Sequence, residues 1–142
     1  MSTPITTGFT PVDLENPTMP TTNDSPALWS HLAMALAWLD AANPRTDHEV
    51  AMRVLKVSEE IGEAAAAYIG MTGQNPRKGI THTREDLAGE LCDVVMSALV
   101  ALATLTGDAD TAQTAMDEHL TRRTPRLHAL IHAATAPTAK EI

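Results

Sequence analysis

Two short segments, Lys56-Val57-Ser58-Glu59-Glu60-Ile61-Gly62-Glu63 and Glu90-Leu91-Cys92-Asp93, decide how this chain folds. Both lie in proline-free stretches rich in Ala, Val and Leu, which favours helices. Each carries two carboxylates three residues apart, and such residues lie about 60° apart on one face of a helix. These carboxylates belong to Glu60, Glu63, Glu90 and Asp93. Two helices that face each other would bring the four together.

Such a cluster of carboxylates predicts a bound cation. Like charges one helical turn apart repel, and four facing carboxylates repel more strongly. Oxygen ligands suit Mg²⁺ or Mn²⁺, whereas zinc prefers His and Cys. A di-iron bundle requires Glu-x-x-His, and here the fourth residue is Glu63 or Asp93. The alternative is that the two segments are solvated faces of acidic helices.

The length and amino-acid composition limit the possible fold classes and binding partners. A chain of 142 residues is long enough for one domain with a single core. Hydrophobic residues make up 44% but aromatic residues only 3%, so the core must consist of Ala, Leu, Val and Met, which favours helices. The net charge of −8 argues against a partner that is a nucleic acid polymer, because such binding needs Lys and Arg against phosphates.

The sequence also indicates the cellular compartment in which the protein is expected. Cys92 is the only cysteine, so no intrachain disulfide can form. The N-terminus lacks the pattern of a signal peptide, and no apolar run is expected to be long enough to span a bilayer. The longest, Val94 to Leu105, is expected to be a buried helix. We therefore expect a cytoplasmic protein with no membrane partner.

The chain divides into a Thr/Pro-rich disordered tail (1–24), a helical domain (25–134) and a frayed tail (135–142). The first helix is predicted from Ser25-Pro26 to about Ala42. Its apolar stripe consists of Leu28, Leu32, Ala35, Leu36 and Leu39. Trp38 shares a side with His31, seven residues earlier. That side could line a pocket in which a base stacks, or it could belong to the core or to an oligomer interface.

Three further helices are predicted. The second begins at Thr46 and ends near Gly70 or Gly73, the third begins at Thr83 with Asp86 and ends at Gly107, and the fourth begins at Asp108 or Asp110. Pro125 ends or kinks the fourth helix after Arg122-Arg123, before a short continuation. The residues predicted to face the core are Val50, Val54, Val57, Ile61 and Ala65 in the second helix and Leu87, Leu91, Val94, Val95, Ala98 and Leu102 in the third. The fold class is all-α, a four- to five-helix bundle.

Basic residues near the acidic segments are candidates for binding an anion. Lys56 lies four residues before Glu60, so it either forms an ion pair along the helix or contacts phosphate oxygens. Arg77 and Lys78 lie in a Gly/Pro loop between the second and third helices. This loop could reach over a bound anion, or it could be a solvated turn.

The order Glu60-Ile61-Gly62-Glu63, a spacer, then Glu90-Leu91-Cys92-Asp93 resembles the ExxE–spacer–ExxD signature of the MazG-like family, the all-α NTP pyrophosphatases. The resemblance covers roughly residues 27 to 126, and the loop 73–79 looks like that of a short single-domain subgroup. It implies hydrolysis of a nucleoside triphosphate, with or without the 2′-hydroxyl, to the monophosphate and pyrophosphate. It also implies Mg²⁺, with Mn²⁺ as the alternative, held by Glu60, Glu63, Glu90 and Asp93.

If the chain catalyses this reaction, further residues of the sequence are candidates for roles in it. The candidate catalytic residues are Glu59, which would orient or deprotonate the attacking water, and the adjacent ligand Glu60. Substrate contacts would come from Lys56, Arg77 and Lys78 to phosphate oxygens and from Trp38 and His31 to the base. The family implies a homodimer or homotetramer in which neighbouring chains complete the bundle. Many relatives place a tryptophan or another aromatic residue close after ExxE. This chain has four alanines there, then Tyr68 and Gly70, so the family's base pocket is not carried over.

Three other functions stay open at this point. One is a helical module that binds nucleotides or metal without turnover. Another is an enzyme like the phosphoribosyl-ATP pyrophosphatases, which have a similar bundle and acidic site. The third is a purely structural helical oligomer, whose stability would not respond to Mg²⁺. The sequence does not indicate which base or sugar would be preferred.

Overall fold

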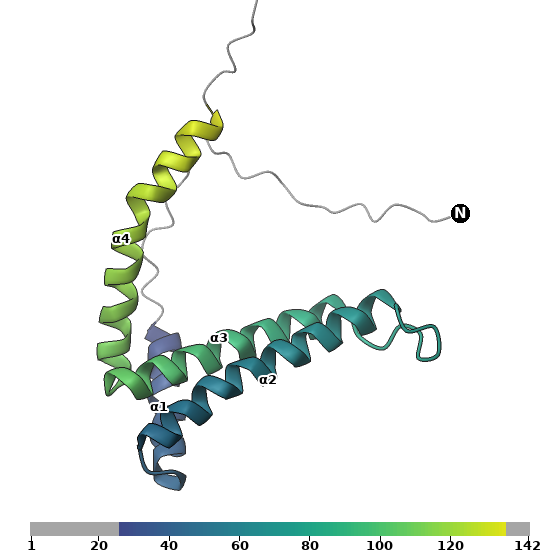
Figure 1. The fold of residues 1–142 in the computed structure, drawn as a ribbon. Coiled ribbons are helices and arrows are strands. Elements are labelled where there is room, and N and C mark those ends of the chain that lie inside the picture. The colour runs from purple at the N-terminus through teal and green to yellow at the C-terminus, as the bar shows by residue number, and fades with distance from the viewer. Residues whose placement is uncertain (1–25, 136–142) are drawn as a thin grey trace, which may run out of the picture. The chain divides into compact units, whose positions relative to one another are not determined.

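The described part of the chain is entirely helical (Figure 1). A computed structural model describes residues 26–135 and contains there α1 (Pro26–Ala42), α2 (Asp47–Thr72), α3 (Arg84–Thr106) and α4 (Ala109–Thr135), with no strand in this range. The predicted all-α class is therefore confirmed, with four helices. The predicted tails 1–24 and 135–142 lie outside the described residues, except for Thr135, which ends α4.

Capping residues set the ends of α2 and α3 where the sequence predicts them. The Thr46 side chain accepts a hydrogen bond from the backbone N–H of Glu49 at 3.1 Å. Gly73 ends α2 in the left-handed region, with φ 61°, which costs a glycine little. Thr83 and Asp86 form a reciprocal capping box at the start of α3. These ends are local properties of the sequence.

Of the two outcomes predicted at Pro125, an end of the last helix is wrong, because α4 continues through Pro125 to Thr135. A proline inside a helix removes one backbone hydrogen bond and does not forbid the turns that follow. The residues after Pro125 include Leu, Ala and Arg, which are good helix formers. These residues continue the helix although Pro125 removes one of its hydrogen bonds.

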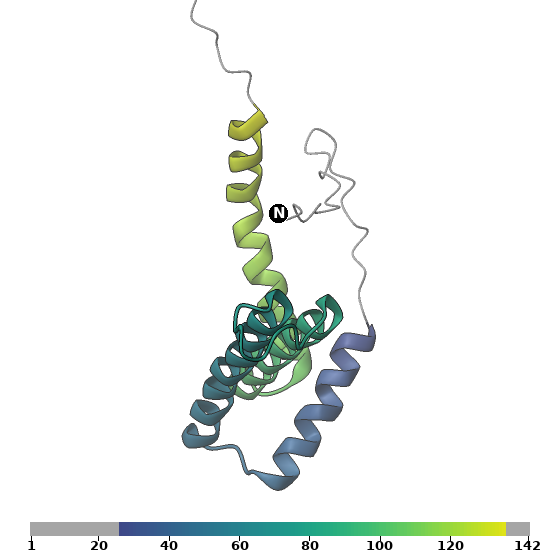
Figure 2. The ribbon, with the colours of Figure 1, turned by 90° about the vertical axis from the view of Figure 1, so that its right-hand side faces the viewer.

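The described residues fall into two compact units. The larger unit, Ser25–Asp117, contains α1, α2, α3 and the first turns of α4, so the predicted domain 25–134 extends beyond it. In this unit α2 and α3 form an antiparallel hairpin, and Figure 2 views it from its loop end with α1 alongside. The rest of α4, from Glu118, belongs to the other unit, where Leu120, Leu127 and Leu130 are exposed.

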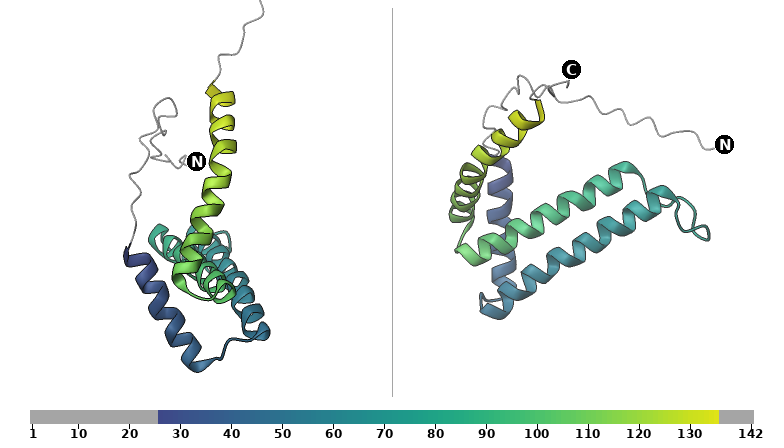
Figure 3. Two further views of the ribbon diagram at one scale, coloured as in Figure 1. Left: turned by 90° about the vertical axis from the view of Figure 1, so that its left-hand side faces the viewer. Right: turned by 45° about the horizontal axis from the view of Figure 1, so that its top comes forward.

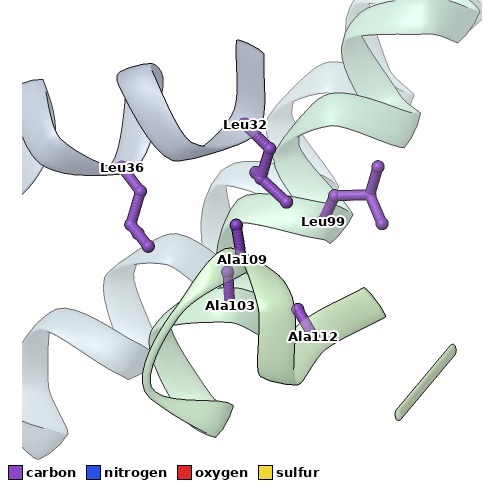
Figure 4. Close-up of a cluster of buried hydrophobic side chains, with 6 residues drawn as sticks. All are labelled: Leu32, Leu36, Leu99, Ala103, Ala109 and Ala112. Carbon is purple, nitrogen blue, oxygen red and sulfur yellow. The ribbon is translucent and has the colours of Figure 1, made fainter. Parts of the chain in front are cut away.

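The core of the larger unit lies where α1 crosses the end of the hairpin farthest from its loop (Figure 3). Figure 4 shows its six buried side chains converging from α1, α3 and the start of α4, namely Leu32, Leu36, Leu99, Ala103, Ala109 and Ala112. The burial of Leu32 and Leu36 confirms the apolar stripe predicted for the first helix. Alanines dominate the rest, so the helices approach closely but bury little apolar area per residue.

The apolar stripes predicted to face the core on α2 and α3 are largely exposed in this chain. Ile61 and Val54 on α2 and Leu91 and Val95 on α3 each expose 53–54% of their surface. The buried residues of α2 are Arg53, Glu60, Ala64, Ala67 and Gly70. The prediction that these stripes form the core is therefore wrong within the chain. Small residues and acidic residues mediate the packing of α2 on α3, because alanine lets two helix backbones approach closely.

The two exposed stripes lie on the same side of the hairpin. On α2, Ile61 is about 100° around the helix from Glu60, and on α3, Leu91 is about 100° from Glu90, in the same sense of rotation. Because the helices are antiparallel and Glu60 and Glu90 face each other, both stripes point to one side. Met96 and Val100, which pack towards α1, are rotated the opposite way from Glu90. The stripes therefore form an apolar face on the side of the hairpin opposite α1.

By length and composition alone, α3 is also a candidate for crossing a membrane, which corrects the expectation that no segment is long enough. The expectation that Val94–Leu105 is a buried helix holds only in part, since Leu99, Ala101 and Ala103 are buried but Val95 and Leu105 are exposed. The same helix carries Glu90 and Asp93, and ionisable residues inside a bilayer are costly. Soluble proteins also contain such apolar helices where another surface covers them.

Candidate metal and nucleotide site

Three of the four predicted acidic ligands converge between α2 and α3. One carboxylate oxygen from each of Glu60, Glu90 and Asp93 lies within 4.8 Å of the other two. Glu60 is only 8% exposed, Glu90 is half-buried and Asp93 is exposed, so the cluster opens to solvent on one side. Three hard oxygen donors from two helices fit a divalent cation such as Mg²⁺.

Lys56 borders this cluster. Its Nζ lies 2.7 Å from Glu59 Oε2 and 3.0 Å from Glu60 Oε1. The hydrogen bond from Lys56 lowers the pKa of Glu60 below its ordinary value even though burial acts in the opposite direction, and the Ser97 hydroxyl also lowers it. The pKa of Lys56 is raised, first by Glu59 and then by Glu60. Lys56 and Glu60 are therefore both charged at neutral pH.

Glu63, the fourth predicted ligand, lies beside the cluster without being one of its three converging residues. The pKa of its carboxyl is raised, first by a hydrogen bond to Glu60 and then by the charge of Glu60, with a smaller contribution from Glu90. The Glu63 carboxyl therefore lies close to that of Glu60, at the edge of the cluster.

A cavity of about 710 Å³ adjoins the cluster, between α1, α2 and α3. Asp93 and Lys56 line it, so it is continuous with the acidic cluster. Its remaining lining residues are His31, Ala35, Leu39, Asn43, His48, Glu49, Met52, Arg53, Met96, Ser97 and Val100. Apolar walls with a few polar groups are typical of small-molecule sites, and the volume lies in their usual range.

A buried ion-pair network forms part of the cavity wall. Arg53, 5% exposed, donates from Nε to Glu49 Oε1 at 2.8 Å and from Nη1 to Thr104 Oγ1 at 2.7 Å. Its Nη2 pairs with Asp40 Oδ1 at 3.0 Å, and Asp40 also pairs with Arg45 at 2.6 Å. The network ties α1, α2 and α3 together around the cavity.

The structure brings only some of the predicted substrate contacts to this site. His31 and Lys56 line the cavity, whereas Trp38 is 72% exposed and does not. Although Trp38 lies on the same side of α1 as His31, it points further outward than Ala35 and Leu39, which line the wall. Glu59 is exposed and pairs with Lys56.

The loop residues Arg77 and Lys78 lie at the far end of the hairpin from the core (Figure 1), and neither lines the cavity. Asn75 holds this loop: its side-chain oxygen accepts from Arg77 N at 3.1 Å and its backbone oxygen from Lys78 N at 3.0 Å. Both cations are exposed. The predicted reach over a bound anion is not present in this conformation.

Several residues that line the cavity were not predicted as site residues, among them Asn43, His48, Glu49, Met52, Arg53 and Met96. The sequence does contain a signal for two of them. Glu49 and Arg53 precede Lys56 and Glu60 at a spacing of four, three and four residues, which places all four residues on one face of α2. Glu49 also follows Thr46 by three residues, the spacing of a capping box, but in the structure its side chain accepts a hydrogen bond from Arg53.

Chemically, the carboxylates can hold a divalent cation, and an anion can bind between that cation and Lys56. The cavity can hold a ring that has both apolar faces and polar edges. These are the parts of a metal-chelated nucleotide. Comparison of the chain with protein-family models, with curated proteins and with solved structures finds no match.

Proposed function

We propose that this protein is a Mg²⁺-dependent nucleoside triphosphate pyrophosphohydrolase, able to use Mn²⁺, which cleaves the substrate to a nucleoside monophosphate and pyrophosphate. The observation that supports it best is the convergence of Glu60, Glu90 and Asp93 beside a cavity large enough for a nucleoside. The resemblance of the two acidic segments to the MazG-like signature supports the same reaction, as does the helical bundle.

In this proposal Glu60, Glu90 and Asp93 hold the metal, and Glu63, which lies beside Glu60, is the candidate for a fourth ligand. When bound, Mg²⁺ supplies charge neutralisation for the phosphates and a more acidic water. Glu60 is fixed by Lys56 on its own helix and faces α3, so its position does not depend on a flexible loop. Lys56 is the candidate cation for phosphate oxygens that the metal does not cover.

The proton balance of the reaction assigns a role to Glu59. The oxygen of a water molecule bonds to the α-phosphorus, and the oxygen that bridges the α and β phosphates leaves with pyrophosphate. A carboxylate accepts the proton that the water loses. Glu59 is our candidate for this proton acceptor because it lies next to the ligand Glu60 and is held by Lys56 at 2.7 Å. Arg77 and Lys78 could contact the pyrophosphate only if their loop moved.

The test is pyrophosphate release from a panel of ribo- and deoxyribonucleoside triphosphates, with and without Mg²⁺, by the wild-type protein and Glu90→Gln. Glu85→Gln on the same helix is the matched control, since Glu85 is an exposed carboxylate outside the cluster. We expect release that requires Mg²⁺, survives in the control and falls at least about 100-fold in Glu90→Gln.

Other outcomes would identify the alternatives. Mg²⁺-dependent nucleotide binding without release would indicate a binding module. Release from phosphoribosyl-ATP but not from free triphosphates would indicate an enzyme of histidine synthesis. A folded protein whose thermal stability responds to neither Mg²⁺ nor nucleotide would indicate a structural role, and the proposal would be wrong.

We also propose that a second copy of this chain covers the apolar face of the hairpin, giving a homodimer or a homotetramer. On α3 the face consists of the exposed residues Leu91, Val95, Ala98 and Leu105, and Leu102 between them is half-buried against the core. Together the five residues are spaced alternately four and three residues apart. This heptad spacing is typical of helices that pack along their length on other helices. The second hairpin would complete a four-helix bundle in a cytoplasmic protein, and binding to lipid instead would be the contrary outcome.

A further inference from the structure

Along α2 the lining of the cavity extends from Lys56 back to Glu49 and His48. Lys56 and Asp93 mark the end next to the acidic cluster, where phosphates are expected. Glu49 lies on the same face of α2 but seven residues earlier, about 10 Å along the helix. Only 16% of its side-chain surface is exposed. A nucleotide with its phosphates at the acidic cluster would therefore direct its base towards the largely buried carboxylate of Glu49.

The position of the Glu49 carboxylate is determined by Arg53. The guanidinium donates to Glu49 Oε1 at 2.8 Å and is itself held by Thr104 on α3 and Asp40 on α1. Arg53 therefore holds the Glu49 carboxylate in one orientation. A carboxylate is only an acceptor, and with about four acceptor positions it can take a second donor from the cavity.

We propose that Glu49 selects the nucleobase, favouring cytosine and adenine, whose exocyclic amino groups occupy corresponding positions, over uracil and thymine. An amino group donates to the carboxylate, whereas the carbonyl oxygen at the same position of uracil or thymine is a second acceptor. A polar group that loses its partner on burial is costly, so this mismatch discriminates strongly. The inference rests on the function proposed above and specifies its substrate class.

The other lining residues suit this orientation of the base. Met52 on α2 and Met96 on α3 offer thioethers, which make favourable contacts with aromatic rings, in a cavity whose described lining has no Trp, Tyr or Phe. Asn43, His31 and His48 can hydrogen-bond to the remaining edges of the base. The cavity volume admits purines and pyrimidines, so the selection is by hydrogen-bonding pattern and not by size.

The first test uses the wild-type protein and nucleotides that differ only in the amino group. These pairs are CTP with pyrimidin-2-one riboside triphosphate and ATP with purine riboside triphosphate, or their 2′-deoxy forms, with UTP as the carbonyl analogue. We expect kcat/KM to fall about tenfold or more when the amino group is removed or replaced by a carbonyl. Equal turnover within both pairs would overturn the inference.

The second test compares Glu49→Gln with Asp47→Asn. Both changes remove one charge from the first turn of α2, but Asp47 does not line the cavity. A glutamine can still accept from Arg53 while presenting an amide N–H to the base, so Glu49→Gln should lose the preference for CTP over UTP or reverse it. Asp47→Asn should keep the preference. An unchanged preference in a folded Glu49→Gln would contradict the role of Glu49.

Failure of this inference and failure of the proposed function are distinguishable. If the wild-type protein releases no pyrophosphate, the proposed function is wrong, and binding of the α,β-methylene analogues of CTP and UTP then tests the base preference directly. Tighter binding of the CTP analogue would still support Glu49 as the selecting residue. Equal binding, or no binding of either, would overturn the inference. If Glu49→Gln does not fold, the pairs of analogues on the wild-type protein decide.

Discussion

Lys56 Nζ lies 3.0 Å from Glu60 Oε1, so in the absence of a divalent ion a lysine ammonium partly neutralises the acidic cluster. The same lysine also pairs with the exposed Glu59, one residue before the buried Glu60. A metal ion would compete with Lys56 for Glu60 and would leave its ammonium free for a phosphate. Lys56 is therefore expected to matter for stability without metal and for substrate binding with metal.

The first prediction concerns Lys56→Met. Without divalent ions the variant should melt a few degrees below the wild-type protein, because the carboxylates lose a neighbouring cation. Mg²⁺ should reduce the difference, since it replaces that charge, and so should raise the melting temperature of the variant more than that of the wild-type protein. Thermal unfolding with EDTA and with Mg²⁺ measures this. Lys78→Met, at an exposed loop lysine outside the cavity, is the control and should melt like the wild-type protein in both buffers.

The second prediction concerns Asp40 and acid. The hydrogen bond from Arg45 is the main cause that lowers the pKa of Asp40 from 3.8, and Arg53 adds to it. Its stabilising effect is therefore complete above the unfolded pKa and is lost as the pH falls through the lower, folded pKa. Asp40→Asn should cost about 2 kcal/mol in the free energy of unfolding at pH 7, because Arg53 keeps only part of its partners.

The same variant should lose less stability than the wild-type protein as the pH falls below about 4. Urea unfolding at pH 7 and at acidic pH measures both effects. Asp117→Asn, which removes an exposed carboxylate with no recorded partner among the described residues, should change neither. Parallel pH profiles for Asp40→Asn and the wild-type protein would contradict the role of the Arg45 and Arg53 contacts.

The third prediction uses two glycines of α2. A Cβ on Gly70 would lie 2.2 Å from His82 Nδ1 and 2.5 Å from Thr81 Oγ1, in the segment that leads into α3. Gly70→Ala should therefore destabilise the protein by about 1–3 kcal/mol. Gly62 has nothing within 4 Å of its Cβ position, so Gly62→Ala should stabilise the helix by about 0.5–1 kcal/mol. Chemical denaturation should give opposite signs for the two variants.

The fourth prediction concerns the apolar face of the hairpin. The wild-type protein should have the mass of a dimer or tetramer of the 15.2 kDa chain in light scattering. Ile61→Glu places a charge in the stripe and should shift the protein towards monomer. Leu55→Glu is the matched control, because Leu55 is as exposed as Ile61 but lies on another side of α2. A wild-type monomer that binds vesicles would instead assign the face to a membrane.

The sequence by itself determined the helices. The ends of α2 and α3 follow from Thr46, Gly73, Thr83 and Gly107, because capping is a contact between residues a few positions apart. The meeting of Glu60, Glu90 and Asp93 was also predictable, since i,i+3 spacing fixes a face and the short loop makes the two helices antiparallel neighbours. Their role as metal ligands stays a prediction.

Only the tertiary structure decided which face of each helix packs inside the chain. Periodicity identifies an apolar stripe, but it does not say whether the surface that covers the stripe belongs to the same chain. Ala64 and Ala67 allow α2 to approach α3 closely on its acidic side, which leaves Ile61 and Val54 exposed. The pairing of Glu49 with Arg53, and of Arg53 with Thr104 51 residues later, likewise required three helices to meet in space. Contacts between residues so distant in the sequence depend on the packing of whole helices, which local patterns do not encode.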